Sequence, residues 1–121
     1  MTADSSRISV VICAYTEARW EALVEAVQSV QRQRLPAQEI IVVIDHNPAL
    51  LARTEQQING VKVIANQQSR GLSGARNSGI AVAQGEIIAF MDEDALADET
   101  WLQQLSLGFQ NQQVQGVGGA I

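Results

Sequence analysis

Four short apolar runs recur along the chain, each bounded by polar residues. They span residues 8–13, 40–44, 61–65 and 87–91. All four are rich in β-branched side chains and shorter than a typical helix, so we interpret them as strands. The first, second and fourth runs are nearly continuous in apolar character, which is typical of strands buried on both faces of a parallel sheet.

Helical periodicity fills the intervals between these runs. Over residues 18–34, Leu23, Val27 and Val30 recur at i, i+4 and i+7, and Pro36 follows soon after. Further helices are predicted at 50–58, at 73–83 with Ser73 as N-cap, and from the N-cap Asp98 onward through Trp101, Leu102, Leu105 and Phe109, with a last strand near Val114.

The alternation of strand and helix predicts the fold class. It is α/β, with right-handed βαβ units forming an open, mostly parallel three-layer α/β/α sheet. The 121 residues fit a single domain, 1–121, because a typical domain has roughly 100 to 150 residues. Ligands of such sheets bind outside the carboxyl ends of the strands. We therefore expect function in the loops that follow Cys13, Ile44, Ala65 and Met91.

Composition and charge narrow the class of function. The net charge is −5 and Lys62 is the only lysine, whereas a nucleic-acid-binding protein normally carries a stripe of Lys and Arg. We therefore expect no nucleic-acid partner. No apolar run approaches the roughly 18 residues of a membrane helix, and the single cysteine, Cys13, excludes an internal disulfide framework. These features favour a cytoplasmic location.

An acidic loop, Asp92-Glu93-Asp94, follows the fourth run. Side chains at i and i+2 of an extended segment point the same way, so we expect Asp92 and Asp94 to converge while Glu93 points elsewhere. Two carboxylates at the mouth of a sheet suit Mg²⁺ or Mn²⁺, which prefer oxygen ligands and often bridge to substrate phosphates. The alternative is an acidic loop that solvates the start of the next helix.

The loops after the first and second runs exclude some sites and leave others open. Residues 13–17 contain no glycine, which excludes both a dinucleotide-binding turn and a P-loop. Asp45 is placed to accept a hydrogen bond from a base or sugar, or else to cap the helix that begins near Pro48. His46 is either a catalytic base or an ordinary polar loop residue.

The loop after the third run, within residues 66–77, has the composition of an anion site. Gly71 and Gly74 allow the backbone to approach a ligand closely, and Arg70 and Arg76 suit a phosphate. The helix predicted to start here would add its N-terminal amides. The alternative is a flexible glycine turn with solvated arginines.

Taken together, these segments resemble the family 2 glycosyltransferases, inverting enzymes of the GT-A fold that use nucleotide-diphosphate sugars. The resemblance runs from Ile8 to Ile121. Its carrying segments are Ser9-Val10-Val11-Ile12-Cys13-Ala14-Tyr15-Thr16-Glu17, Glu39-Ile40-Ile41-Val42-Val43-Ile44-Asp45, Gly71-Leu72-Ser73-Gly74-Ala75-Arg76-Asn77-Ser78-Gly79 and Gly85-Glu86-Ile87-Ile88-Ala89-Phe90-Met91-Asp92-Glu93-Asp94.

The resemblance implies a role for each motif residue. Its donor would be a UDP-sugar, and its cofactor Mn²⁺ or Mg²⁺. The implied contacts are Ala14, Tyr15 and Glu17 lining the nucleotide pocket, Asp45 on the base, Arg76 and the backbone at Gly74 beside the nucleotide, Asp92 on the ribose and diphosphate, and Asp94, with Asp92, on the metal.

Two departures from the family pattern occur. The first loop has Cys13 and Thr16 where the family usually has Pro or Thr and Asn, and Asp45-His46-Asn47 replaces Asp-Asp or Asp-Gly-Ser. The second departure affects base recognition. The combined motifs are similar to those of bacterial members related to glucuronosyl or glucosyl transferases that act on lipid-linked sugars, so the implied acceptor is a sugar, a lipid-linked sugar or a glycan.

The inverting reaction also needs a general base, which the family places in its acceptor-binding half. We expect that base beyond Ile121, with the acceptor half absent and these residues alone inactive. The chain would then be the donor half of a longer enzyme, whose parent lies at the cytoplasmic face of the membrane, or a degenerate stand-alone module. An apolar sheet edge left open near Val114 would favour homo-oligomers. The competing class is a non-catalytic nucleotide-binding or regulatory α/β interaction module.

Overall fold

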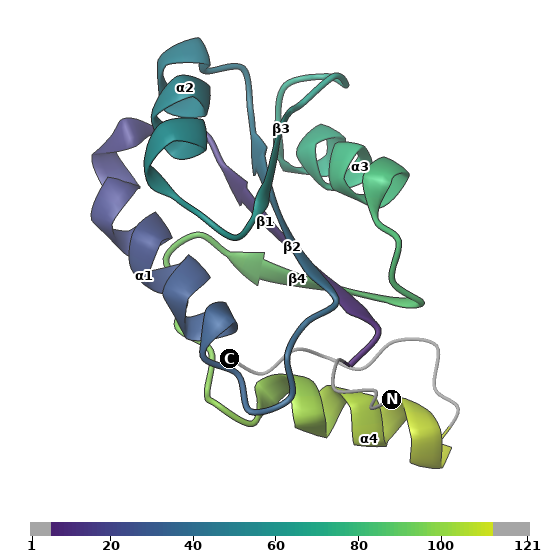
Figure 1. Cartoon of the computed structure of the whole chain (residues 1–121). Helices are drawn as coiled ribbons and strands as arrows, with labels where there is room; N and C mark the ends of the chain where they lie inside the picture. The colour runs from purple at the N-terminus through teal and green to yellow at the C-terminus, as the bar shows by residue number, and fades with distance from the viewer. Residues whose placement is uncertain (1–5, 113–121) are drawn as a thin grey trace.

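The computed structural model describes the backbone of residues 6–112 and the side chains of residues 6–108 (Figure 1). The elements in chain order are β1 Ile8–Ala14, a 3₁₀ turn η1 Glu17–Arg19, α1 Trp20–Gln31, β2 Glu39–Ile44, α2 Pro48–Gln57, β3 Lys62–Ala65, α3 Leu72–Val82, β4 Ile87–Asp92 and α4 Trp101–Gln112. The predicted alternation of strands and helices is confirmed.

The four strands form one parallel sheet in the order β3-β2-β1-β4. In register, Cys13 of β1 lies opposite Val43 of β2 and Asp92 of β4. The carboxyl ends of the two central strands and of β4 are therefore level, and the loops that follow them meet at one edge of the sheet.

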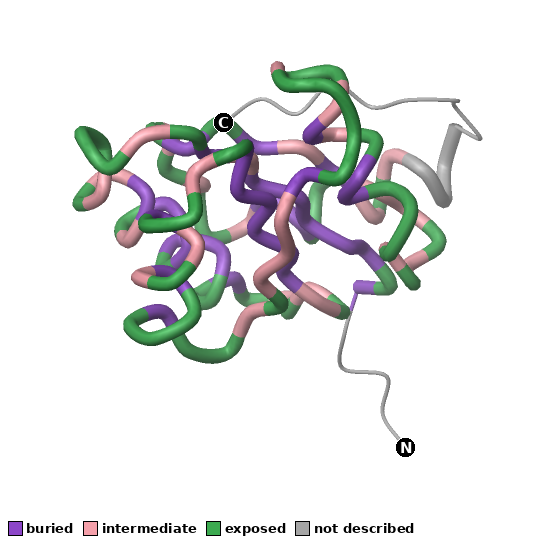
Figure 2. The backbone as a smooth tube through the Cα atoms, turned by 90° about the horizontal axis from the view of Figure 1, so that it is seen from above, coloured by how far each residue is buried: buried purple, intermediate pink, exposed green. Residues whose placement is uncertain are grey.

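Helices cover both faces of this sheet, which confirms the three-layer α/β/α class. The larger apolar cluster joins β1, β2 and β4 to α1, α2 and α4 on one face. A smaller cluster on the other face joins Val11, Ile41 and Val43 to Ala75 of α3. Figure 2 shows the buried backbone running through the centre of the molecule, with exposed loops around it.

α3 approaches the sheet closely because it carries a glycine where it crosses β1. A Cβ built on Gly79 would lie 2.6 Å from Val11 Cγ1. Gly79 is itself buried, so a larger side chain there would have to push α3 away from the sheet. The position of α3 matters because its first turn forms one wall of the cleft described below.

Several helices begin one or two residues away from their predicted starts because of local turns and caps. α1 begins at Trp20 rather than at 18 because η1 precedes it. The N-cap of α3 is Gly71 at φ 123°, not Ser73, so that prediction is wrong: the left-handed backbone at Gly71 turns the chain into the helix one residue before Ser73. The Asp98 side chain accepts a hydrogen bond from Thr100 N at 2.9 Å, just before α4.

Some predictions concern residues that the structure does not describe. The strand predicted near Val114 lies outside residues 6–112, as does the sheet edge inferred from it. In the described part of the chain, no helix is both long enough and apolar enough to cross a membrane.

Candidate functional site

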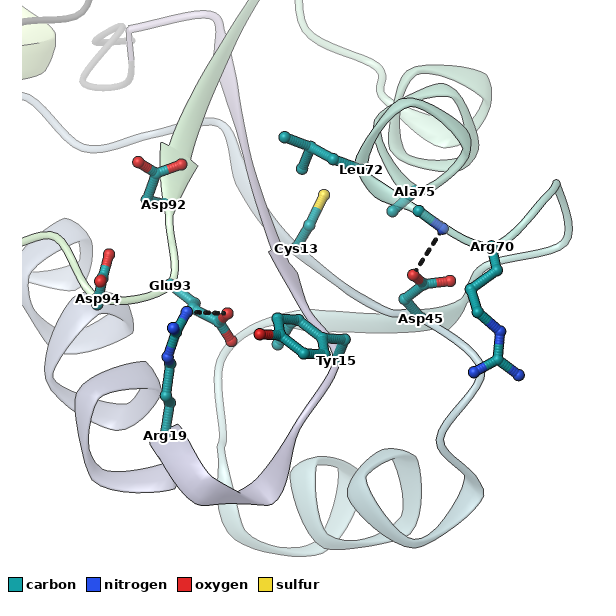
Figure 3. Close-up of a pocket in the computed structure, with 12 residues that line it drawn as sticks. Cys13, Tyr15, Arg19, Asp45, Arg70, Leu72, Ala75, Asp92, Glu93 and Asp94 are labelled. Atoms are coloured by element: carbon teal, nitrogen blue, oxygen red, sulfur yellow. Dashed lines mark hydrogen bonds and ion pairs between the residues drawn. The ribbon is translucent and has the colours of Figure 1, made fainter.

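A cleft of about 540 Å³ opens at the carboxyl edge of the sheet (Figure 3). It lies where the loops after β1, β2 and β4 meet the loop before α3. Its lining residues are Cys13, Ala14, Tyr15, Arg19, Asp45, Arg70, Gly71, Leu72, Ala75, Asp92, Glu93 and Asp94. This is the edge at which parallel sheets bind ligands, as the element order predicts.

The acidic loop supplies two exposed carboxylates on one side of the cleft. β4 ends at Asp92, and the chain then turns, with Ala95 N donating to Asp92 O at 3.1 Å. Asp92 and Asp94 are exposed while Glu93 between them is buried. Figure 3 shows the two aspartate side chains pointing away from Glu93. The alternation expected for an extended segment is thus produced by a turn.

The residues at this turn fit a divalent cation that takes its remaining ligands from water or a substrate. Within residues 6–112, no group of three or more His, Cys, Asp or Glu side chains is arranged to hold a metal ion. Asp92 and Asp94 would therefore supply at most two carboxylates, and water or substrate oxygens the rest. Mg²⁺ commonly binds in this way, through one or two carboxylates plus phosphates.

Glu93 and Arg19 tie the acidic loop to the loop after β1. Arg19 Nη1 lies 3.3 Å from Glu93 Oε1, and the Arg19 guanidinium carbon lies 5.9 Å from the centroid of the Tyr15 ring. Burial raises the pKa of Glu93, and the charge of Arg19 partly opposes this shift. The pair places a positive charge in the otherwise acidic side of the cleft.

Sequence reasoning missed Arg19. Its position depends on η1, which turns the chain so that Arg19 points back toward β4 (Figure 3). No motif spacing reports that turn. The nearest local signal is Thr16, whose Oγ1 accepts from Ala18 N at 3.1 Å and caps η1.

Asp45 is a buried carboxylate whose two oxygens are both engaged. Oδ1 accepts from Asn66 Nδ2 at 2.8 Å and lies 2.6 Å from His46 Nδ1, while Oδ2 accepts from Gly71 N at 2.9 Å. Burial alone would raise the pKa of Asp45, but the hydrogen bonds from Asn66, His46 and Gly71 outweigh it and lower the pKa below its ordinary value. Capping of α2 falls instead to Asn47, whose Oδ1 accepts from Leu50 N at 3.0 Å.

The structure brings together most, but not all, of the residues singled out in the sequence. Those that line the cleft are Ala14, Tyr15, Asp45, Arg70, Gly71, Asp92 and Asp94. Glu17, Gly74 and Arg76 lie outside its lining. Glu17 pairs with Arg53 at 3.7 Å, and the Arg76 guanidinium lies 5.1 Å from the centroid of the Phe90 ring.

Apolar side chains also border the cleft. Tyr15 is 56% exposed and Leu72 is 53% exposed, and both belong to the lining. Cys13 lies at the back between them (Figure 3). Burial raises the pKa of the Cys13 thiol to about 11, which keeps it neutral at physiological pH. The cleft therefore combines apolar surface with a few polar and charged groups, as small-molecule sites often do.

Comparison with known sequences identifies the family. The model of the family described as "Glycosyl transferase family 2" matches residues 9–121. The Glucosyl-dolichyl phosphate glucuronosyltransferase of Haloferax volcanii is 31% identical over 119 residues, covering 95% of this chain and 38% of the relative. Glycosyltransferase GlyG of Streptococcus pneumoniae is 32% identical over 105 residues, covering 84% of this chain and 34% of the relative.

Solved structures support the same fold. Mannosyltransferase PcManGT from Pyrobaculum calidifontis, in complex with GDP-Man and Mn²⁺, superposes with a TM-score of 0.72 at 22% identity, over 93% of this chain and 36% of that one. Residues 1–349 of Staphylococcus aureus TarS give a TM-score of 0.68 at 21% identity, over 94% of this chain and 38% of that fragment. The chain thus spans little more than a third of the length of the two curated relatives and of PcManGT. It belongs to glycosyl transferase family 2.

Proposed function

We propose that this chain is the donor-binding part of an inverting glycosyltransferase, which binds a UDP-sugar together with Mn²⁺ or Mg²⁺. The observation that carries the proposal is the turn after β4, where Asp92 and Asp94 are exposed beside the cleft while Glu93 is buried. Family membership and the Mn²⁺ and GDP-Man named for PcManGT support a metal and a nucleotide sugar.

Asp92 and Asp94 would hold the metal on the acidic side of the cleft. A bound divalent cation would offset the charge that develops on the departing diphosphate. Arg19 would add a fixed positive charge on the same side, held in place by Glu93. The nucleoside would occupy the opposite side, between Tyr15 and Asp45.

A lipid-linked sugar is the acceptor class that we propose for the whole enzyme. The name of the Haloferax volcanii relative, a glucosyl-dolichyl phosphate glucuronosyltransferase, supports this choice. The relative is matched over only 38% of its length, so the acceptor remains a proposal for the longer enzyme. Assay of the longer enzyme with lipid-linked glucosides and UDP-glucuronic acid tests this part of the proposal.

We infer that residues 1–121 lack the general base and transfer no sugar by themselves. The support is the family match, in which this chain covers only 38% of the Haloferax volcanii relative and leaves most of that length to supply the base. Two titratable side chains near the cleft are the alternatives: His46, whose Nδ1 lies 2.6 Å from Asp45, and Glu93, which is buried against Arg19. A radiolabelled UDP-sugar incubated with this polypeptide, metal and acceptors should yield hydrolysis or nothing. Measurable transfer would contradict the inference and would make His46→Asn and Glu93→Gln the next variants.

Calorimetry tests the donor and metal site directly. We expect UDP to bind in the presence of Mn²⁺, to bind at least about tenfold more weakly in EDTA, and to lose affinity similarly in Asp94→Asn. GDP titrated in parallel reports whether the base is read. UDP binding of equal strength in EDTA would contradict the metal role.

Glu55→Gln supplies a matched control for this experiment. Glu55 is exposed on α2, away from the cleft lining, and its substitution removes one negative charge in the same way. Its affinity for UDP and Mn²⁺ should equal that of the unaltered chain. No nucleotide binding by the unaltered chain under any condition would contradict the proposal and favour a non-catalytic interaction module.

A further inference from the structure

Asn66 is a buried residue just beyond β3 that does not line the cleft. Its backbone N donates to Ile44 O at 2.8 Å, which continues the pairing of β3 with β2. The five residues that follow it, 67–71, lead to Arg70 and Gly71, which do line the cleft. Asn66 therefore lies at the start of the segment that forms one wall of the cleft.

The Asn66 amide makes all four hydrogen bonds that its atoms allow. Nδ2 donates to Asp45 Oδ1 at 2.8 Å and to Ser69 O at 3.0 Å. Oδ1 accepts from Gln68 N at 2.8 Å and from Ser78 Oγ at 2.7 Å. The backbone N–H of Gln68 can only donate, and the backbone carbonyl of Ser69 can only accept. These two partners therefore determine which end of the Asn66 side-chain amide is the oxygen and which is the nitrogen.

Two further contacts close the loop around Asn66. A Cβ built on Gly74 would lie 2.0 Å from Ser69 O, so the Ser69 carbonyl is held between the first turn of α3 and the Asn66 amide. Gly71 N donates to Asp45 Oδ2 at 2.9 Å. The Asp45 carboxylate therefore fixes both ends of the segment 66–71, and Asn66 fixes Asp45.

We propose that Asn66 is a positioning residue for donor binding, which holds the Asp45 carboxylate and the Arg70 and Gly71 wall in place before a nucleotide arrives. This inference rests on the proposed function. A wall that is already ordered adds no ordering cost when the ligand binds. Loss of the two Nδ2 donors would leave Asp45 and the Ser69 carbonyl without their partner, and the wall would have to order on binding.

Asn66→Asp tests whether Asn66 acts through its hydrogen-bond donors rather than only through the size of its side chain. The substitution keeps the shape and the acceptor for Ser78 and Gln68, but replaces the donor to Asp45 with a second carboxylate. At about pH 8 the two carboxylates repel, and at about pH 5 a proton shared between them restores a donor. We expect UDP affinity, measured with Mn²⁺ and relative to the unaltered chain, to fall at least about tenfold at the higher pH and to recover at the lower one.

Three charged or titratable groups lie in contact with Asp45 or line the cleft with it. His46 contacts it from the same loop, Cys13 lies on β1 and Arg70 lies on the loop before α3. Each is present in the unaltered chain as well, so affinity is expressed at each pH as a ratio to that of the unaltered chain, and Asn66→Ala, which adds no titratable group, shows whether that ratio changes with pH for another reason.

Matched variants complete the test. Asn77→Asp makes the same chemical change at an exposed position of α3 and should leave UDP affinity unchanged. Asn66→Ala removes the amide and leaves no group to protonate, so its affinity should be weak at both pH values. Circular dichroism at each pH gives the folded fraction, and affinities are compared per folded molecule, a quantity that a purely structural role for Asn66 would not change.

The outcomes separate this inference from the proposed function. If the unaltered chain binds no nucleotide, the proposed function fails. If it binds and folded Asn66→Asp binds equally well at about pH 8, or binds weakly with no recovery at about pH 5, the positioning role is overturned. Should Asn66→Asp not fold, Ser78→Ala removes the hydroxyl that donates to Asn66 Oδ1 and accepts from Gln67 N, the residue next to Asn66, and unchanged affinity in that variant overturns the inference.

Discussion

At the scale of single residues, chemistry that depends on near neighbours in the sequence was predictable and chemistry that depends on distant partners was not. The exposure of Asp92 and Asp94 around a buried Glu93 agrees with the alternation predicted from the sequence, although a turn rather than an extended segment produces it. The partners of Asp45 do not, because Asn66 lies 21 residues away and is brought to it only by the pairing of β2 with β3.

Cys13 gives a prediction that rests on burial. Desolvation is the largest cause of a pKa raised from 9.0 to about 11, and Arg76 only partly opposes it. Because the thiolate is the reactive form, its population at about pH 8 should be roughly a hundredfold below that of a free cysteine. Alkylation by iodoacetamide should be correspondingly slow in the folded chain and fast in urea. Equal rates in the two states would contradict a thiol whose pKa is raised by partial burial.

At the scale of secondary structure elements, glycines mark the places where α3 touches the rest of the molecule. The two glycines inside this helix weaken a prediction of helix from propensity alone. The structure gives the physical reason for both: Gly79 meets Val11 on the sheet, and Gly74 meets Ser69 on the preceding loop. Neither contact is visible in the sequence pattern, and the helix start was misplaced at Ser73 for a separate reason, the positive φ of Gly71.

Gly74→Ala distinguishes helix propensity from packing. Propensity alone favours Ala in a helix by up to about 1 kcal/mol. A Cβ that lies 2.0 Å from the Ser69 carbonyl must displace the loop, so we expect a net loss of about 1 to 3 kcal/mol of unfolding free energy. Urea denaturation measures it, with Ser73→Ala, at an exposed position of the same turn, as the control. A more stable Gly74→Ala chain would show that the loop yields freely.

Glu39 joins elements at the opposite edge of the sheet. Its Oε2 accepts from Ser9 Oγ at 2.6 Å and from Gln84 N at 2.6 Å, and its Oε1 lies 3.4 Å from Lys62 Nζ. Burial alone would raise the pKa of Glu39, but these partners outweigh it and lower the pKa below 4.5. A carboxylate whose pKa is lower in the folded state stabilises that state above its unfolded pKa, and the stabilisation is lost as pH falls through the folded pKa.

Glu39→Gln should therefore destabilise the chain by about 1 to 2 kcal/mol at neutral pH. The difference from the unaltered chain should shrink as the pH falls below about 4. Urea denaturation across this pH range measures both effects. Glu86→Gln serves as control, because Glu86 pairs with Arg7 only at the exposed surface. A difference that stays constant down to low pH would contradict the role of the Glu39 charge.

At the scale of the whole molecule, the alternation of buried strands and amphipathic helices predicted the α/β/α layers, because a helix follows each strand in sequence and packs back against the sheet. The place of the site followed from the same pattern, since the carboxyl ends of parallel strands share one edge. The content of the cleft was only partly predictable. Arg19 lines the cleft because a 3₁₀ turn positions it there, whereas Arg76 lies outside the lining, over the ring of Phe90.

The central claim is that Asp92 and Asp94 hold a divalent cation against the diphosphate of a nucleotide bound in this cleft. The most direct measurement is a crystal structure of the chain with Mn²⁺ and UDP, with anomalous scattering to locate the metal. We predict manganese at about 2.0 to 2.3 Å from a carboxylate oxygen of Asp94 or Asp92 and from a diphosphate oxygen. A nucleotide bound outside the cleft, or manganese coordinated by neither aspartate, would contradict the account.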